Sequence, residues 1–297
     1  MTKPLTIAQF FAKFPNDEVC LNHLFEVRFG QGYTCPSCER PSNWYRIKAE
    51  RAYSCQWCGH HLHPTVGTPF AKTRTPLQSW FYAIYLFTTT RNGVAAKELQ
   101  RQLGVTYKTA WLMADRIRAH MADVDGNDMI GGEGCEVEID ETLIGGATTG
   151  GGRGNYRSNK TVVLGMVERG GNVVTTVVPD AKRASLLPAI AANVRPGALV
   201  HTDQNHAYRV LPDHGFAHQK VNHANEEWVR GNTHVQTIEG FWGQLKRSIS
   251  GTHIHVSGKH LWKYAKEAEF RFNRRDRQAS MLPDLLSTFQ PLPAKSR

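Results

Sequence analysis

Two Cys-x-x-Cys pairs near the N-terminus constrain the fold of this chain more than any other feature. Cys35 and Cys38 form the first pair, Cys55 and Cys58 form the second, and 16 residues lie between them. Four thiolates at this spacing suit tetrahedral zinc, because each tight turn supplies two ligands. A redox-active pair is the alternative, but the surrounding sequence lacks a thioredoxin-like strand–helix–strand pattern. The sequence therefore predicts a zinc ribbon within residues 1–70, in which Zn²⁺ stabilises the fold.

The charge of the chain points to a polyanionic partner. Its formal net charge is +10 and its pI is about 9.4. Basic chains are attracted to polyanions, most often to nucleic acid, although a merely basic globular protein is the alternative. The sequence contains no apolar run long enough for a membrane span and no secretory signal at its start. We therefore expect a cytoplasmic protein without a membrane partner, whose cysteines are thiols or zinc ligands.

A group of helical patterns follows the cysteine-rich region. These patterns cover residues 76–89, 94–103 and 106–121. Gly104 favours a helix end, and Thr106 favours the start of the next helix. A helix, a tight glycine turn and a second helix form the helix-turn-helix pattern, so we predict a DNA-binding module over residues 71–122. Tyr107 and Lys108 would then lie at the end of the recognition helix that enters the major groove, whereas an ordinary helical hairpin is the alternative.

A mixed sheet is predicted after a glycine-rich linker. Strand patterns cover residues 135–144, 160–168, 173–178 and 198–202, with a further strand at 218–223 and a helix at 184–194. The first strand alternates apolar with acidic residues, which indicates one apolar and one acidic face. The order of these elements resembles a ribonuclease-H-like α/β domain, here over residues 132–280. The glycine-rich segment 145–154 predicts a loop, and residues 281–297 predict a C-terminal tail.

A helix is predicted over residues 237–247. Ile238, Trp242 and Leu245 share one stripe at helical spacing, so this face is expected to be buried. Glu239 and Lys246 are seven residues apart, or about two turns, and project together from another face. The pair could be a structural ion pair or one wall of an active site.

Three acidic residues have positions that suit a shared site. Asp140 lies in the first strand of the sheet, Asp203 ends the fourth, and Glu239 lies on the last helix. Clustered carboxylates repel one another unless cations neutralise them, and oxygen ligands suit Mg²⁺ or Mn²⁺. Two such ions support phosphodiester chemistry without a covalent protein intermediate. Each acid taken alone could be a solvated surface residue, and Glu138, on the same strand face as Asp140, is the most credible substitute ligand.

The chain resembles the DDE-type bacterial insertion-sequence transposases of the fifteen-ninety-five family. The motifs that carry the resemblance run in order along most of the chain: residues 33–38, 66–70, 76–81, 98–105, 108–111, 137–142, 202–203, 238–242, 245–247, 255–261 and 270–275. The resemblance implies a zinc ribbon and a helix-turn-helix followed by a ribonuclease-H-like catalytic domain. It also implies an enzyme that binds terminal inverted repeats of double-stranded DNA and cuts and joins DNA strands with Mg²⁺ or Mn²⁺.

Site residues follow from the resemblance position by position. Asp140, Asp203 and Glu239 correspond to the catalytic, metal-binding acids. Gln236 stands where the family often has Asn, so either Gln236 or Lys246 could also contribute to the catalytic set. Lys246 matches a basic residue that contacts the transposon end in related enzymes.

Further basic residues extend the predicted DNA contact. Residues 240–277 contain nine Lys or Arg and three acidic residues. The residues expected to contact phosphates are Lys246, Arg247, Arg271, Arg274 and Arg275, although a solvated helical face is the alternative for some of them.

The resemblance also suggests partners and competing functions. Coordinated action on two transposon ends and a target suggests a homo-oligomer on DNA, associated with the nucleoid when bound. A non-catalytic DNA-binding regulator is the alternative function. A structure-selective nuclease would share the metal chemistry, but it would not need the helix-turn-helix.

Overall fold

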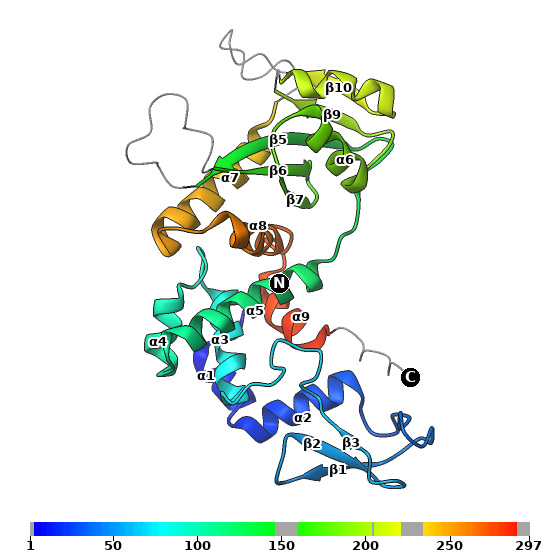
Figure 1. Ribbon diagram of the computed structural model, residues 1–297, viewed down its shortest axis with the longest axis vertical. Helices are drawn as coiled ribbons and strands as arrows, with labels where there is room; N and C mark the ends of the chain where they lie inside the picture. The colour runs from blue at the N-terminus through cyan, green and yellow to red at the C-terminus, as the bar shows by residue number, and fades with distance from the viewer. Residues whose placement is uncertain (1–2, 146–159, 204, 221–233, 290–297) are drawn as a thin grey trace. The chain divides into compact units, whose positions relative to one another are not determined.

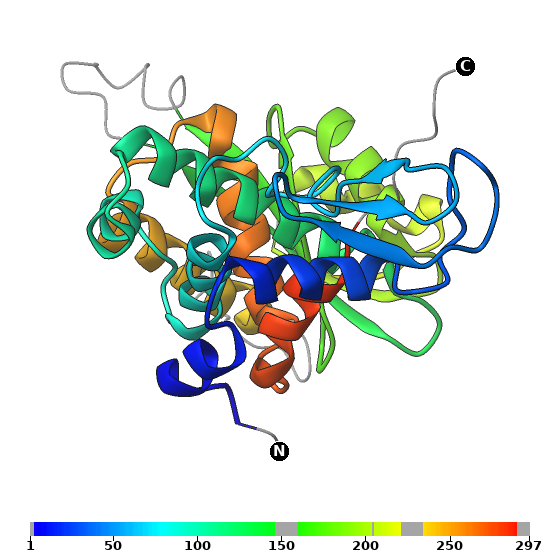
Figure 2. The ribbon, with the colours of Figure 1, turned by 90° about the horizontal axis from the view of Figure 1, so that it is seen from below.

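A computed structural model describes residues 3–145, 160–203, 205–220 and 234–289. The chain separates into two compact units, which can be followed by colour in Figures 1 and 2. The first unit comprises Met1–Thr90, Val94–His120 and Arg277–Arg297, and the second comprises Arg91–Gly93 and Met121–Asp276. None of the described helices is both long and apolar enough to cross a membrane.

The first unit begins with two helices and a small antiparallel sheet. Its elements are α1 (Ile7–Lys13), α2 (Asp17–Arg28), β1 (Trp44–Ile47), β2 (Ala52–Cys55) and β3 (His61–Leu62), with strand order β1-β2-β3. Thr6 starts α1 with a capping box, and Asn16 accepts the backbone N–H of Val19 to start α2. Side chains of this type satisfy N–H groups that a helix leaves unpaired in its first turn. Strands β1 and β2 lie between the two cysteine pairs, and β2 ends at Cys55.

Three further helices follow: α3 (Leu77–Thr89), α4 (Ala96–Leu103) and α5 (Tyr107–Asp125), of which α5 belongs to this unit up to His120. Gly104 ends α4 in the left-handed conformation, with φ of 64°, and its N–H donates to the Gln100 carbonyl. The Thr106 hydroxyl accepts the N–H of Thr109 at 3.2 Å, which caps the start of α5. The end of α4 and the start of α5 therefore lie where the sequence predicts them, at the glycine that ends one helix and the threonine that caps the next.

The predicted C-terminal tail instead starts with a packed helix. Gln278–Ser280 form a 3₁₀ turn that leads into α9 (Met281–Ser287), which packs against α2 and α3. Met281, Leu282, Leu285 and Leu286 are all buried. Apolar side chains at helical spacing gain free energy by burial, which explains why this short segment is ordered.

The second unit is built on a five-stranded sheet with the order β10-β9-β5-β6-β7. Its strands are β5 (Glu136–Ile144), β6 (Thr161–Glu168), β7 (Val173–Val178), β9 (Leu199–Thr202) and β10 (Ala217–Lys220). The first three pair antiparallel, whereas β9 pairs parallel to both β5 and β10. A separate parallel pair joins β4 (Ile130–Gly131) to β8 (Val194–Arg195). Most of the predicted glycine-rich loop, and residues 221–223 of the predicted last strand, lie outside the described residues.

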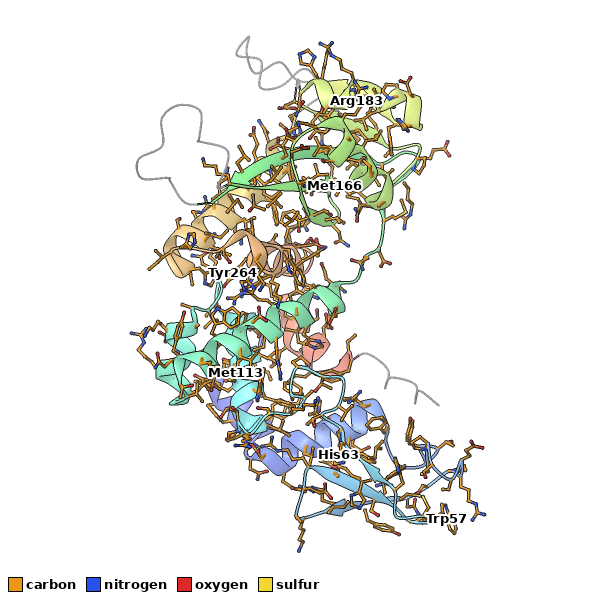
Figure 3. The ribbon with its side chains drawn as sticks, viewed as in Figure 1. Trp57, His63, Met113, Met166, Arg183 and Tyr264 are labelled. Carbon is orange, nitrogen blue, oxygen red and sulfur yellow. The ribbon has the colours of Figure 1, made fainter. Side chains whose placement is uncertain are left out.

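Helices cover the two faces of this sheet. One face packs on α6 (Arg183–Asn193), where Met166 of β6 lies in a core with Leu186 and Ile190 (Figure 3). The other face packs on α7 (Gln236–Ser248) and α8 (Gly258–Phe272). A π-helical turn, Ile249–His253, follows α7, and 3₁₀ turns at His206–Val210 and Pro212–His214 follow β9. Because successive strand residues face opposite sides, Glu138 and Asp140 share the face that carries α7.

Candidate functional site

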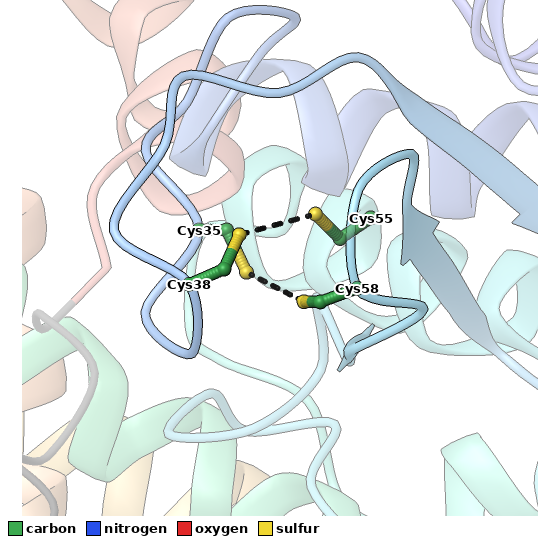
Figure 4. A group of neighbouring side chains, drawn as sticks. All are labelled: Cys35, Cys38, Cys55 and Cys58. Atoms are coloured by element: carbon green, nitrogen blue, oxygen red, sulfur yellow. Dashed lines mark hydrogen bonds between the residues drawn. The ribbon is translucent and has the colours of Figure 1, made fainter.

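The four paired cysteines converge on one point (Figure 4). Cys35 and Cys58 have their sulfurs 3.7 Å apart, and Cys38 and Cys55 have theirs 3.8 Å apart. Sulfurs about 2.3 Å from a central zinc lie about 3.8 Å from each other in a tetrahedron, so the spacing fits Zn²⁺. All four sulfurs lie within 4.8 Å of one another. Within the described residues, these cysteines are the group of potential metal ligands that lies this close together.

Neighbouring donors support the thiolate ligands. The Ser42 hydroxyl donates to Cys55 at 3.2 Å, and the backbone N–H of Ser37 donates to Cys35 at 3.4 Å. Hydrogen bonds of this kind orient metal ligands and stabilise their negative charge. The site therefore has the donor set of a closed structural zinc centre. Cys20, which is not one of the four ligands, differs from them: burial, followed by the charge of Asp17, raises the pKa of its thiol to about 12.

Asp140 and Asp203 come together through the pairing of β5 with β9. Glu138 pairs with His201 in parallel register, and Asp140 and Asp203 lie two residues further along the respective chains. Asp203 accepts the backbone N–H of Asn205 at 3.0 Å, which holds its carboxylate at the strand end. Parallel strands therefore bring acids from distant parts of the sequence to the same edge of the sheet.

The environment of Asp140 opposes its negative charge. Burial, followed by the charges of Glu141 and Asp203, raises the pKa of Asp140 from 3.8 to about 7. The indole N–H of Trp242 donates to the Asp140 carboxylate at 3.0 Å. Carboxylates that are buried near one another favour protonation or a bound cation. The donor chemistry at this edge therefore fits a hard divalent cation.

Glu141 is a third acid beside Asp203. The Asn205 side-chain amide donates to it at 2.6 Å, and the Tyr208 hydroxyl also donates to it. Burial is the largest of the causes that raise the pKa of Glu141. Glu141 follows Asp140 directly in the strand, so its side chain lies on the side of the sheet opposite α7. The two donors hold its carboxylate there.

Glu239, the third predicted ligand, is carried by α7 and not by the sheet. It lies in the first turn of α7 and is exposed, as is Gln236. Within the described part of the chain, Asp140, Asp203 and Glu239 do not form a group whose ligand atoms all lie within 4.8 Å of one another. The other side of α7 matches the sequence, since Ile238, Trp242 and Leu245 are buried.

Known proteins now connect these features to a family. Residues 130–273 match the model of the ISXO2-like transposase domain, and residues 15–61 match that of the transposase zinc-ribbon domain. An uncharacterised transposase-like protein of Haemophilus influenzae is 34% identical over 116 residues, which cover 93% of that protein and 38% of this chain. The chain belongs to the family of ISXO2-like transposases.

Two other matches are more distant. An uncharacterised protein in the transposable element ISH50 of Halobacterium salinarum is 27% identical to this transposase, over 87% of its chain and 91% of that protein. A chain in the structure of a simian T-cell lymphotropic virus intasome in complex with PP2A regulatory subunit B56 gamma is 18% identical. The match covers 58% of the transposase and 63% of that chain, with a TM-score of 0.28.

The basic residues of the transposase divide into exposed and paired groups. Lys246 and Arg247 are exposed in the last turn of α7, and Tyr107 and Lys108 are exposed in the first turn of α5. These four remain available as predicted DNA contacts.

The predicted contacts on and after α8 have protein partners instead. Arg274 is only 5% exposed, forms an ion pair with Asp125 and lies over the Phe270 ring. Arg271 forms an ion pair with Glu267 at 2.8 Å. Arg275 donates to the Gly171 carbonyl at 3.0 Å and lies over the ring of Phe272. Their burial and pairing argue against direct phosphate contacts by Arg271 and Arg274, because a guanidinium already paired in the interior has few donors left.

Sequence reasoning missed how closely α7 approaches the sheet. Gly165 pairs directly with Asp140 across β5 and β6. A Cβ atom there would lie 2.5 Å from Trp242 and 2.8 Å from Ile238. A glycine inside a strand often marks such an approach, so the signal was present in the sequence.

Proposed function

We propose that this transposase binds the terminal inverted repeats of an insertion sequence and cuts and joins DNA strands. The observation that carries the proposal is the meeting of Asp140 and Asp203 on adjacent parallel strands in a domain of this family. We further propose that the domain is ribonuclease-H-like. Support comes from three antiparallel strands, β5 to β7, extended by parallel strands β9 and β10, with helices on both faces.

Catalytic Mg²⁺ or Mn²⁺ would be held by Asp140, Asp203 and Glu239. The burial of Asp140 and its repulsion by Glu141 and Asp203 support a cation at this site, because a divalent ion would neutralise these charges. Such ions activate an attacking water or hydroxyl and stabilise the leaving oxygen of a phosphodiester. Trp242 would orient Asp140 through its indole N–H, and the Asn205 backbone would orient Asp203.

DNA recognition is assigned to two kinds of element. We propose that α4 and α5 form a helix-turn-helix, supported by the left-handed Gly104 turn and by exposed Tyr107 and Lys108 at the start of α5. Lys246 and Arg247 would contact DNA phosphates near the acids, since both are exposed on α7. Action on two ends at once would require a homo-oligomer on DNA, working in the cytoplasm at the nucleoid.

The test is strand cleavage of DNA that carries the element's own ends, with Mg²⁺ present. Asp203→Asn should abolish cleavage while end binding persists, because it removes a ligand charge. Asp213→Asn is the matched control, since Asp213 is an exposed acid on the 3₁₀ turn Pro212–His214. Unchanged cleavage by the Asp203→Asn protein would refute the proposed chemistry.

One observation favours a second candidate, a DNA-binding regulator that does not cut DNA. Among the described residues, Asp140, Asp203 and Glu239 do not form a group whose ligand atoms all lie within 4.8 Å of one another. The regulator predicts that the wild-type protein binds the ends without cutting them, and that substituting the acids leaves binding unchanged.

A further inference from the structure

Glu138 is a fully buried acid that lies beside the proposed active site. Its side chain has 0% exposure and projects from β5 on the same face as Asp140. Four hydrogen bonds reach its carboxylate: from the Thr237 backbone at 2.8 Å, the Ile238 backbone at 3.1 Å, the Thr237 hydroxyl at 3.0 Å and the Arg169 Nε at 2.9 Å. Three of these four donors belong to the first turn of α7.

These bonds leave Glu138 no capacity for a metal ion. A carboxylate offers about four lone-pair sites, and four donors already use them. A fifth group, His234 Nδ1, lies 3.2 Å from the Glu138 carboxylate but forms no hydrogen bond with it. Glu138 therefore does not fit the role of substitute metal ligand that its place in the strand suggests.

Two carboxylates of β5 instead hold α7 at successive turns. Glu138 takes donors at Thr237 and Ile238, and Asp140 takes the indole N–H of Trp242. Two strand residues span about 6.7 Å, and the four residues from Ile238 to Trp242 span about 6 Å along a helix axis. Both sets of bonds form together in this register, and a shift of α7 by one residue would move the donors at Thr237, Ile238 and Trp242 away from their carboxylates.

We propose that Glu138 is a positioning residue that sets this register and thereby places Glu239 relative to Asp140. Glu239 follows Ile238 directly in the chain, so a shift at the start of α7 moves it. Arg169 compensates the buried charge of Glu138, to which it donates from the turn after β6. The role of Glu239 as a metal ligand rests on the proposed function, whereas the anchoring of α7 does not.

The anchoring is tested by NMR-detected hydrogen exchange of the Thr237 and Ile238 amides. Glu138→Gln keeps the shape of the side chain but puts an amide against Arg169, so exchange of both amides should accelerate about fivefold or more. Thr237→Val removes only the hydroxyl donor and should give a smaller acceleration. Glu269→Gln is the matched control, because Glu269 is also buried and accepts a backbone N–H, that of Thr175 on β7. Unchanged exchange in Glu138→Gln would overturn the proposal.

The effect on Glu239 is tested by Mn²⁺ affinity in a double-mutant cycle. If Glu138 acts through Glu239, Glu138→Gln lowers the affinity about 10-fold in the wild-type background, and it changes the affinity less than about twofold in a Glu239→Gln background. Equal losses in both backgrounds would make Glu138 an independent ligand and would overturn the proposal. Strand cleavage by Glu138→Gln should show a lower kcat with an unchanged KM for end DNA. A wild-type protein that binds no Mn²⁺ would refute the proposed function, while the exchange result would still decide whether Glu138 anchors α7.

Discussion

Replacing Gly165 by alanine tests whether close packing of α7 on the sheet sets up the site. The added Cβ would lie 2.5 Å from Cζ2 and 2.7 Å from Cη2 of Trp242, and 2.8 Å from Cδ1 of Ile238. Overpacking of this kind costs about 1–3 kcal/mol, and the stiffer alanine backbone offsets about 0.5–1 kcal/mol of it. We therefore expect Gly165→Ala to lower the free energy of unfolding by about 1 kcal/mol, the difference between the midpoints of these two ranges.

Urea unfolding of the zinc-loaded protein, followed by circular dichroism, measures this change. Gly240→Ala is the matched control on α7, because no atom lies within 4 Å of a Cβ built there. That change should raise stability by up to about 1 kcal/mol, since alanine favours helix over glycine. Trp242→Phe removes the ring atoms that clash, so it should offset part of the Gly165→Ala loss in the double variant. A Gly165→Ala protein as stable as the wild type would refute the packing that the structure describes.

Three further outcomes follow from the site geometry. Cys58→Ser should lose the zinc that elemental analysis finds in the wild type, whereas Cys20→Ala should retain it, and zinc retained by Cys58→Ser would contradict the four-thiolate centre. Because the folded-state pKa of Asp140 is raised to about 7, its ionisation destabilises the fold progressively as pH rises from about 4 to 7. Asp140→Asn should therefore be more stable than the wild type at pH 8 without Mg²⁺, by at most about 4 kcal/mol, and the gain should vanish below pH 4 in unfolding experiments; a gain independent of pH would contradict the assigned cause. Lys108→Ala should weaken DNA binding and reduce the slope of log affinity against log salt by about 1, and an unchanged slope would remove Lys108 from the DNA contact.

Features encoded over short stretches of sequence were predictable. Each pair of cysteine ligands lies in a single turn, so the spacing of Cys35 and Cys38 alone identifies two of the four zinc ligands. The alternation of β5 and the buried stripe of α7 follow from the periods of strand and helix. The approach of Asp140 to Asp203 also followed, because parallel strands align their ends.

Pairings between distant residues were not predictable in the same way. Arg274 belongs to a basic run that resembles a DNA contact, but the fold buries it against Asp125, 149 residues earlier. Glu138 resembles a spare metal ligand, but its donors on α7 come from about 100 residues later. A charge in the sequence shows which partners are possible, and only the packing of the chain decides between a phosphate, a metal ion and another side chain.

The most direct test of the central claim is anomalous diffraction at the manganese edge, from crystals of the protein with Mn²⁺ and an end oligonucleotide. The account predicts manganese bound by Asp140, Asp203 and Glu239, with Glu138 still bonded to the start of α7. Manganese absent from Asp140 and Asp203, or bound by Glu138, would contradict it.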